Sequence, residues 1–222
     1  MDNSRLQQIY DAASRLFIVQ GYAQTRIEHI AKAAGVSVGT IYNEFAGKRE
    51  ILHFIIKCNI DSEYINGDFT RPISENDVAA LSEEFFKVAS EAQERFNRYL
   101  PDKTHLYSFE RLISDIFDTI AKYAVAFLFI ERNPVESGPI FSRYNDYRSQ
   151  FISTLLQYID AFMKSGEIRE LKYPQHSVVL IIETLSWWCM HRPYSRYSNN
   201  EISMEQAKEV VMDGLVSAYK KV

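Results

Sequence analysis

The sequence contains little cysteine, proline and glycine, and each shortage argues against a class of protein. Its 222 residues include two cysteines, six prolines and eight glycines. Cys58 and Cys189 cannot build the disulfide framework of a small secreted domain, and the first residues lack the basic and then apolar pattern of a secretion signal. We therefore expect a reduced, cytoplasmic setting. The longest apolar run, residues 123–130, is much shorter than the roughly 20 residues that cross a bilayer, so we expect no membrane partner.

The scarcity of proline and glycine favours long helices with few turns. All six prolines lie at or after Pro72 and bracket long periodic segments, whereas glycines separate the segments of the first 70 residues. We expect an all-α fold of about nine helices, with an N-terminal helix-turn-helix head and a larger body. The predicted domains are residues 1–47 for the head, 48–66 for a connecting helix and 67–222 for the body. Body helices are predicted over residues 75–99, 103–131, 139–165, 174–191 and 204–220.

Charge is distributed unevenly along the chain. The formal net charge is −4, which taken alone speaks against a nucleic-acid partner. Residues 1–60 nevertheless carry a net charge of +2, and residues 61–222 carry −6. A mildly basic head on an acidic body is compatible with a DNA-binding head.

Two helical patterns meet in the head at the turn Ala34-Gly35-Val36-Ser37. The first two helices are predicted to begin at capping boxes, Ser4 with Gln7 and Thr25 with Glu28, and Ser37 is predicted to cap a short third helix anchored by Ile41 and Phe45. A helix-turn-helix needs a residue that tolerates positive φ in its turn, which Gly35 supplies. This pattern is typical of proteins that place a helix in the major groove of DNA.

The candidate DNA-binding side chains are short and polar, or basic. Gly39 inside a helix costs about 1 kcal/mol against alanine, which suggests close approach to a phosphate or base edge. A cation in the first turn of a helix opposes the helix dipole, so Lys48 there indicates a phosphate partner, and Arg26 with Thr25 would face the same backbone. The predicted DNA-binding residues are Thr25, Arg26, Ser37, Gly39, Thr40, Tyr42, Asn43 and Lys48.

The head resembles the N-terminal signature of the tetracycline-repressor-like (TetR) family of one-component regulators over residues 5–52. The matching residues are Ala12, Ala13, Leu16, Phe17, Gly21, Tyr22, Thr25, Ile27, Ile30, Ala31, Ala34, Gly35, Val36, Ser37, Gly39, Ile41, Tyr42, Phe45 and Lys48. The resemblance implies a homodimer that binds a near-palindromic operator in double-stranded DNA. It further implies a body that binds a small effector and then releases the DNA.

One position departs from the family pattern. Glu44 stands where the family usually has a Tyr or His that touches the DNA backbone, and a carboxylate there would repel phosphate. We expect Glu44 to turn toward Arg49 or His29, or else to reduce operator affinity. Two alternatives remain: a three-helix domain that does not bind DNA, and a helical ligand-binding or scaffold protein whose DNA binding is weak or lost.

The body contains aromatic stripes and a stripe of small residues. Core packing explains any single aromatic residue, but a tyrosine-lined cavity would suit a small effector. The predicted effector-binding residues are Tyr107, Phe117, Tyr123, Phe127, Tyr147, Phe151, Trp187 and Trp188. One of the two tryptophans is expected to pack inward and the other to face a partner or a pocket. Ala207, Val211, Gly214 and Ala218 form a small-residue face that is predicted to be the dimer interface, with an intramolecular helix crossing as the alternative.

No pattern indicates catalysis or a bound cofactor. The five histidines are scattered, neither cysteine has a ligand-spaced partner, and a nucleophile elbow and a phosphate-binding glycine loop are both lacking in the sequence. We therefore expect no enzyme activity, no cofactor and no metal.

Overall fold

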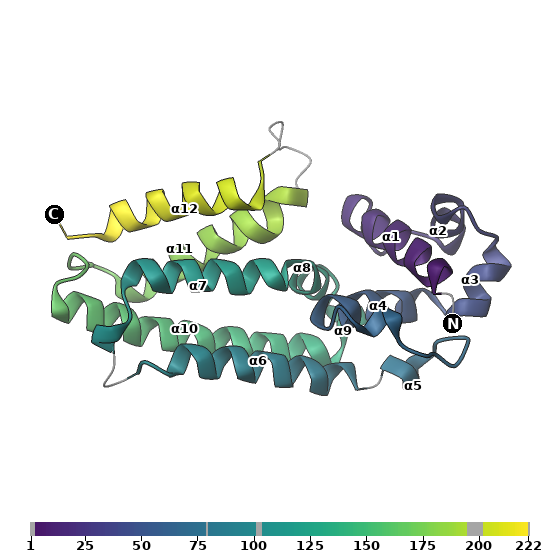
Figure 1. The fold of residues 1–222 in the computed structure, drawn as a ribbon, viewed down its shortest axis with the longest axis horizontal. Coiled ribbons are helices and arrows are strands. Elements are labelled where there is room, and N and C mark those ends of the chain that lie inside the picture. Colours follow the sequence, from purple (N-terminus) through teal and green to yellow (C-terminus); the bar gives the residue numbers. More distant parts are fainter. Residues whose placement is uncertain (1–2, 79, 101–103, 195–201, 222) are drawn as a thin grey trace. The chain divides into compact units, whose positions relative to one another are not determined.

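The computed structural model describes residues 3–78, 80–100, 104–194 and 202–221, and these residues form helices with short connections (Figure 1). The chain divides into two compact units. The first comprises residues 1–88 and 125–143, and the second comprises residues 89–124 and 144–222. The all-α fold is confirmed. The domain boundary predicted at residue 67 stays a prediction, because the two compact units meet at other residues, after residues 88, 124 and 143.

The first unit contains a helical head and the segments that follow it. Its helices are α1 (Ser4–Val19), α2 (Ile27–Ala34), α3 (Val38–Glu44), α4 (Lys48–Ile60), α5 (Glu75–Val78), the beginning of α6 (Leu81–Asn97), most of α8 (Ala124–Arg132), and α9 (Pro134–Ser137). A 3-10 turn, η1 (Tyr64–Asn66), lies between α4 and α5. The core of this unit includes the fully buried aliphatic residues Leu6, Ile9, Ile30, Ile41 and Ile51 and the buried aromatic residues Phe17, Phe45 and Phe54.

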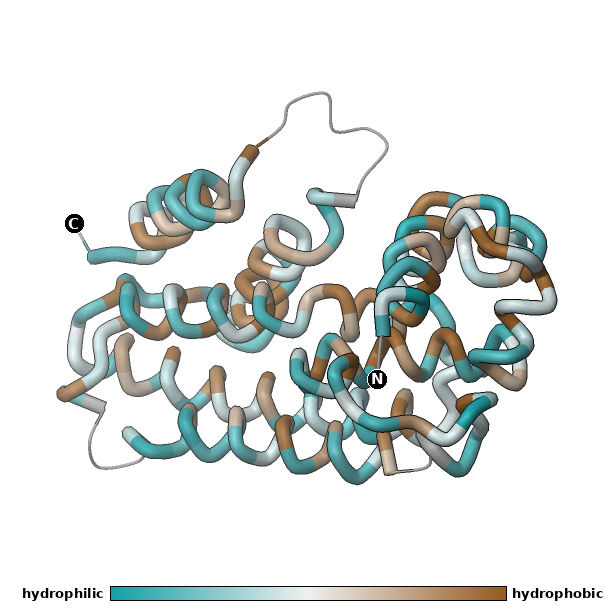
Figure 2. Tube along the Cα trace, turned by 45° about the vertical axis from the view of Figure 1, so that its right-hand side comes forward, coloured by the Kyte–Doolittle hydropathy of each residue, from teal (hydrophilic) through white to brown (hydrophobic). Residues whose placement is uncertain are grey.

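The second unit is built on α10 and its neighbours. Its elements are the end of α6, a 3-10 turn η2 (Thr104–Leu106), α7 (Phe109–Lys122), most of α10 (Pro139–Ser165), α11 (Pro174–Ser186), a π-helical turn η3 (Trp187–His191), a 3-10 turn η4 (Arg192–Tyr194) and α12 (Met204–Tyr219). Brown and teal residues alternate along α12, the helix next to the C-terminus in Figure 2, as expected for a helix with one buried face. Its inward residues are Ala207, Val211, Leu215 and Tyr219.

Several predicted helix ends are confirmed. The helix at residues 139–165 has the predicted bounds, α12 ends one residue before the predicted end, and Ser203 with Gln206 forms the predicted capping box. The Ser203 Oγ accepts from the Gln206 N–H at 3.1 Å, and the Ser203 N–H donates to the Gln206 side chain at 3.0 Å.

Both capping boxes predicted in the head are wrong. Asn3, not Ser4, precedes α1, and its side-chain amide donates instead to the carbonyls of Ile65 and Gly67. Helix α2 begins at Ile27 after Arg26, whose N–H donates to Nδ1 of His29 at 3.4 Å. Thr25 lies one residue too early to cap the helix, and its side chain points inward.

Three of the predicted body helices are interrupted. Residues 75–99 form α5 and α6, with Ala79 between them outside the described residues. Residues 103–131 form η2, α7 and α8, with a break at Tyr123, while Lys103 lies outside the described residues. Residues 174–191 remain α-helical to Ser186 and then widen into the π turn. No glycine or proline marks the break at Tyr123 or the π turn, which explains why neither was expected.

Candidate nucleic-acid interface

The turn between α2 and α3 has the predicted geometry. Gly35 has φ +69°, in the left-handed region, and the Val36 N–H donates to the Ala31 carbonyl at 3.0 Å. A Cβ on Gly35 would meet nothing within 4 Å. The positive φ, and not a lack of space, therefore favours glycine here.

Helix α3 is a two-turn helix with one buried and one exposed side. Ser37 caps it, since its Oγ accepts from the Thr40 N–H at 3.0 Å. Ile41 and the following Phe45 are fully buried and anchor the helix to the head. The opposite side presents exposed polar positions, including Tyr42 with 51% of its surface accessible. Of the predicted DNA-binding residues, Arg26, Ser37, Gly39, Tyr42 and Asn43 are exposed and Thr40 is half-buried.

Gly39 lies on the exposed side of α3. A Cβ there would meet only the Ser37 Oγ at 3.6 Å, an ordinary van der Waals contact. Packing within the chain therefore does not require glycine, although glycine costs about 1 kcal/mol against alanine inside a helix. The position leaves room for another molecule to approach the backbone of α3.

Thr25 and Lys48 form contacts within the head. Thr25 is fully buried, and its hydroxyl donates to the Gly21 carbonyl at 2.8 Å. Its side chain therefore cannot face DNA, which corrects that part of the prediction. The Lys48 Nζ donates to the carbonyls of Tyr22 and Thr25 at 2.8 and 2.9 Å, and lies 4.1 Å from the centre of the Tyr22 ring. Lys48 thus fastens the beginning of α4 to the α1–α2 connection.

Burial shifts the pKa values of Tyr22 and Lys48. The pKa of the Tyr22 hydroxyl is raised to about 12, mainly by burial and also by the carboxylates of Glu136 and Glu50. The pKa of the Lys48 ammonium is lowered by its removal from water, an effect that Glu136 opposes. With a pKa near 12, the Tyr22 hydroxyl stays neutral at neutral pH.

Glu44 faces inward, toward a partner that the sequence analysis missed. Its side chain is 6% exposed, and Oε2 lies 2.5 Å from the Nε of Arg71. The expected partners are engaged elsewhere: Arg49 pairs with Glu75, and His29 accepts from the Arg26 backbone. The expectation of Arg49 or His29 is therefore wrong. Arg71 follows Glu44 by 27 residues, beyond the reach of any helical spacing rule, so no local signal could have identified it.

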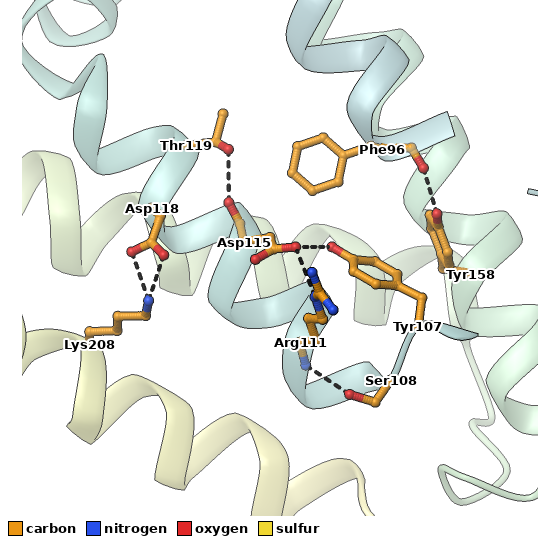
Figure 3. Close-up of polar contacts among 9 residues, drawn as sticks. All are labelled: Phe96, Tyr107, Ser108, Arg111, Asp115, Asp118, Thr119, Tyr158 and Lys208. Atoms are coloured by element: carbon orange, nitrogen blue, oxygen red, sulfur yellow. Dashed lines mark hydrogen bonds and ion pairs between the residues drawn. The ribbon is translucent and has the colours of Figure 1, made fainter. Parts of the chain in front are cut away.

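The predicted effector-binding aromatics of the second unit are largely packed as a core. Figure 3 shows the Tyr107 hydroxyl directed at Asp115, to which it donates at 2.7 Å, and the Tyr158 hydroxyl directed at the Phe96 carbonyl. Tyr107 also stacks on Tyr99 with ring centres 4.6 Å apart. Burial, followed by the bond to Asp115, raises the pKa of Tyr107. These hydroxyls already have partners, so they do not present free donors to a ligand.

The other predicted aromatics occupy several environments. Phe117 and Phe151 are in the core of the second unit, Tyr123 is buried, and half-buried Tyr147 stacks on Phe151 at 6.0 Å. Phe127 belongs to the first unit and contacts Phe85. A hollow of about 300 Å³ lies beside the beginning of α11. It is lined by Leu156, Asp160, Lys172, Tyr173, Pro174, Gln175 and His176, none of which was predicted.

The two tryptophans differ, as expected. Trp187 is 52% exposed, whereas Trp188 packs partly against the core beneath the guanidinium of Arg192.

The four residues of the predicted dimer interface lie in two different environments. Ala207 and Val211 are buried in the core of their own chain, so they are not available to a partner, which corrects that part of the prediction. Gly214 and Ala218 are exposed, on the outward side of α12.

Comparisons with known proteins agree with this head. Residues 9–55 match the family model of bacterial regulatory proteins of the tetR family. The HTH-type transcriptional regulator TcmR of Streptomyces glaucescens is 36% identical over 81 residues. That match spans 36% of this chain and about a third (35%) of the relative, so it concerns the N-terminal part alone.

Longer similarities extend over the body. The biofilm operon icaADBC HTH-type negative transcriptional regulator IcaR of Staphylococcus aureus is 24% identical over 215 residues, which are 96% of this chain and 98% of the relative. The structure of the ketosteroid transcriptional regulator KstR2 of Mycobacterium tuberculosis superimposes with a TM-score of 0.61 at 17% identity, covering 100% of this chain and 97% of that one. The second similarity shows a shared fold. These findings identify residues 9–55 as a DNA-binding domain of the tetR family of bacterial regulatory proteins, in a chain whose all-α fold is shared with a solved transcriptional regulator.

Proposed function

We propose that this protein is a dimeric, cytoplasmic transcriptional repressor that binds a near-palindromic operator and leaves it when a small effector binds the body. The observation that carries the proposal is α3 itself. A two-turn helix is anchored by Ile41 and Phe45 and exposes Gly39, Tyr42 and Asn43 on its other side. Such a helix can enter the major groove of DNA, while the exposed Arg26 and the half-buried Lys48 ammonium carry positive charge for phosphates.

Similarity along the whole chain supports a repressor. IcaR is described as a negative transcriptional regulator, and its match covers both the head and the body. The observation that favoured a protein with weak or lost DNA binding was a carboxylate facing the DNA backbone. Glu44 is buried and paired with Arg71, so its charge is not directed at a phosphate.

Exposed apolar side chains on α11 and α12 support dimerisation through these two helices. Leu180 is 60% exposed, Trp187 beyond the end of α11 is 52% exposed, and Val210 is 48% exposed. Gly214 and Ala218 share the outward side of α12, where their small side chains permit close helix approach. A two-fold axis would bury these residues against their own copies.

Helix α4 is the proposed route of effector control. Lys48, at its beginning, binds the carbonyls of Tyr22 and Thr25, and His53, one turn further on, lies 2.8 Å from the Glu136 carbonyl through Nε2. A displacement of α9 would therefore move α4 and, with it, the head. The two heads must lie about 34–36 Å apart, or a multiple of this distance, to enter successive major grooves, so a small tilt of α4 would weaken binding.

Selection from a random-sequence DNA pool tests the proposal. The wild-type chain is expected to enrich a near-palindromic duplex at low salt, and the Tyr42→Ala variant is expected to enrich it poorly while keeping its thermal unfolding midpoint. Tyr42 is half exposed, so its removal should leave the core unchanged. If the wild-type chain enriches no sequence even at low salt, the DNA-binding proposal is refuted and the ligand-binding or scaffold alternative is favoured.

A further inference from the structure

Residues 61–73, here named the strap, leave the end of α4 and return to the head. Asn3 anchors the strap through its side-chain amide, which donates to the carbonyls of Ile65 and Gly67 at 2.9 and 3.0 Å. Phe69 packs edge-on against Phe54 of α4, with ring centres 5.5 Å apart. The strap is therefore tied to both α1 and α4.

The end of the strap pairs with the end of α3. The Ile73 N–H donates to the Glu44 carbonyl at 2.8 Å, and the Ala46 N–H donates to the Ile73 carbonyl at 2.9 Å. Phe45 and Ile73, both fully buried, form an isolated parallel bridge. The last residue of α3 and the residues after it are thus held by backbone contacts to a segment far along the chain.

Arg71 adds a charged contact at the same place. Its Nε meets the Glu44 carboxylate at 2.5 Å, and its Nη2 donates to Oδ1 of Asn3 at 3.2 Å. The Glu44 side chain is only 6% exposed, whereas in the comparable Arg143–Glu83 pair the carboxylate side chain is 70% exposed. Without Arg71, Glu44 would keep a buried, unpaired charge, which is strongly unfavourable, while Glu83 would return to water at little cost.

We propose that Arg71 is a positioning residue for DNA recognition, which acts through Glu44 to hold the C-terminal turn of α3 in its DNA-reading orientation. This inference rests on the proposed function. A two-turn helix is too short to be stable alone, so its orientation depends on its anchors. Ser37 fixes its beginning, and Arg71 with the strap fixes its end, beside Tyr42 and Asn43. Two guanidinium nitrogens of Arg71 already contact Glu44 and Asn3, which supports a role through Glu44.

Binding measurements with four variants test the proposal. The probes are the duplex enriched by the wild-type chain and a scrambled duplex of the same composition, each titrated at several salt concentrations. Arg71→Ala is expected to raise the Kd for the enriched duplex roughly tenfold, similar to losing one base contact, and to leave the scrambled duplex and the salt slope unchanged. Glu44→Gln should have a smaller effect, because a neutral amide at this buried position leaves no unpaired charge and its oxygen can still face the Arg71 guanidinium. The double variant should lose no more affinity than Arg71→Ala, and the matched control Arg143→Ala should bind both duplexes like the wild type.

Three results would overturn the proposal. One is an unchanged Kd for the enriched duplex in Arg71→Ala. Another is equal weakening for both duplexes with a salt slope lowered by about one, which would assign Arg71 to a phosphate contact. The third is additive losses from Arg71→Ala and Glu44→Gln. If Arg71→Ala does not fold, the double variant replaces it in these titrations, because it lacks the bare buried carboxylate.

Hydrogen exchange separates this inference from the proposed function. Amides of residues 41–45 should exchange faster in Arg71→Ala, or in the double variant, than in the wild type, and should be unaffected in Arg143→Ala. If the wild-type chain enriches no duplex, the proposed function fails, yet the exchange experiment still decides whether Arg71 holds α3. Unchanged exchange at residues 41–45 would refute the positioning role itself.

Discussion

Replacing Gly39 with alanine should separate folding from DNA binding. The added Cβ would meet only the Ser37 Oγ, at 3.6 Å, and the position is exposed and helical. Alanine is favoured over glycine inside a helix by about 1 kcal/mol, so the variant should be more stable. For a chain of this size that gain raises the melting temperature by about 2–4 °C. At a tightly packed core position the same substitution would lower the stability, because the new methyl group would have to displace its neighbours.

The same methyl group should weaken DNA binding. If α3 lies in the major groove, the methyl group occupies the space into which a base edge or phosphate approaches. Loss of one such contact costs about 1–3 kcal/mol, so the Kd for the enriched duplex should rise between roughly five- and 150-fold. Thermal unfolding and fluorescence anisotropy would measure the two effects on one preparation. A variant that is less stable than the wild type, or one that binds the duplex equally well, would refute the reasoning.

Three other predictions follow from particular contacts. Gly214→Ala, with nothing within 4 Å of its Cβ, should stabilise an isolated protomer yet weaken the dimer in sedimentation equilibrium, and unchanged dimerisation would exclude Gly214 from the interface. Lys48→Ala removes two hydrogen bonds to carbonyls, so the free energy of unfolding should fall by about 2 kcal/mol. Every duplex should also bind more weakly. A stability equal to wild type would contradict the role of Lys48 in fastening α4 to the α1–α2 connection. The pKa values of Tyr147 and Tyr158 are raised to about 12 from 10.0, mainly by burial, which means that folding favours their neutral forms. The stability that these two tyrosines contribute should therefore be complete below pH 10 and be lost between pH 10 and 12, and Tyr158→Phe should reduce this slope in urea titrations.

Features of the head that depend on neighbouring residues could be predicted from the sequence. Gly35 and Ser37 act through their own φ angle and through a hydrogen bond three residues away, so a short window contains all the information. The exposed side of α3 follows in the same way from the spacing of Ile41 and Phe45. The prediction for Thr25 was wrong because the neighbouring residues do not decide its role. Threonine suits both a helix cap and a buried hydrogen bond to the Gly21 carbonyl, and only the fold decides between them.

Features that depend on distant residues could not be predicted. Glu44 meets Arg71 because the strap returns to the head, and no periodicity reports that path. On α12, Ala207 and Ala218 are the same residue, yet Ala207 is buried and Ala218 is exposed, so a pattern of small residues does not tell the side that faces the chain's own core from the side that faces solvent. The tyrosines of the body were equally ambiguous, because a buried hydroxyl needs a partner and a protein carboxylate such as Asp115 serves as well as a ligand.

Methylation interference on the enriched duplex tests most directly whether α3 lies in the major groove. N7 of guanine is exposed in that groove, so a methyl group there blocks a helix that reads the base edges. The account predicts two symmetric blocks of interference, centred about one helical turn or a multiple of it apart. In Gly39→Ala, interference at one guanine within each block should be lost. Interference confined to adenine N3 in the minor groove, or binding unaffected by methylation anywhere, would contradict it.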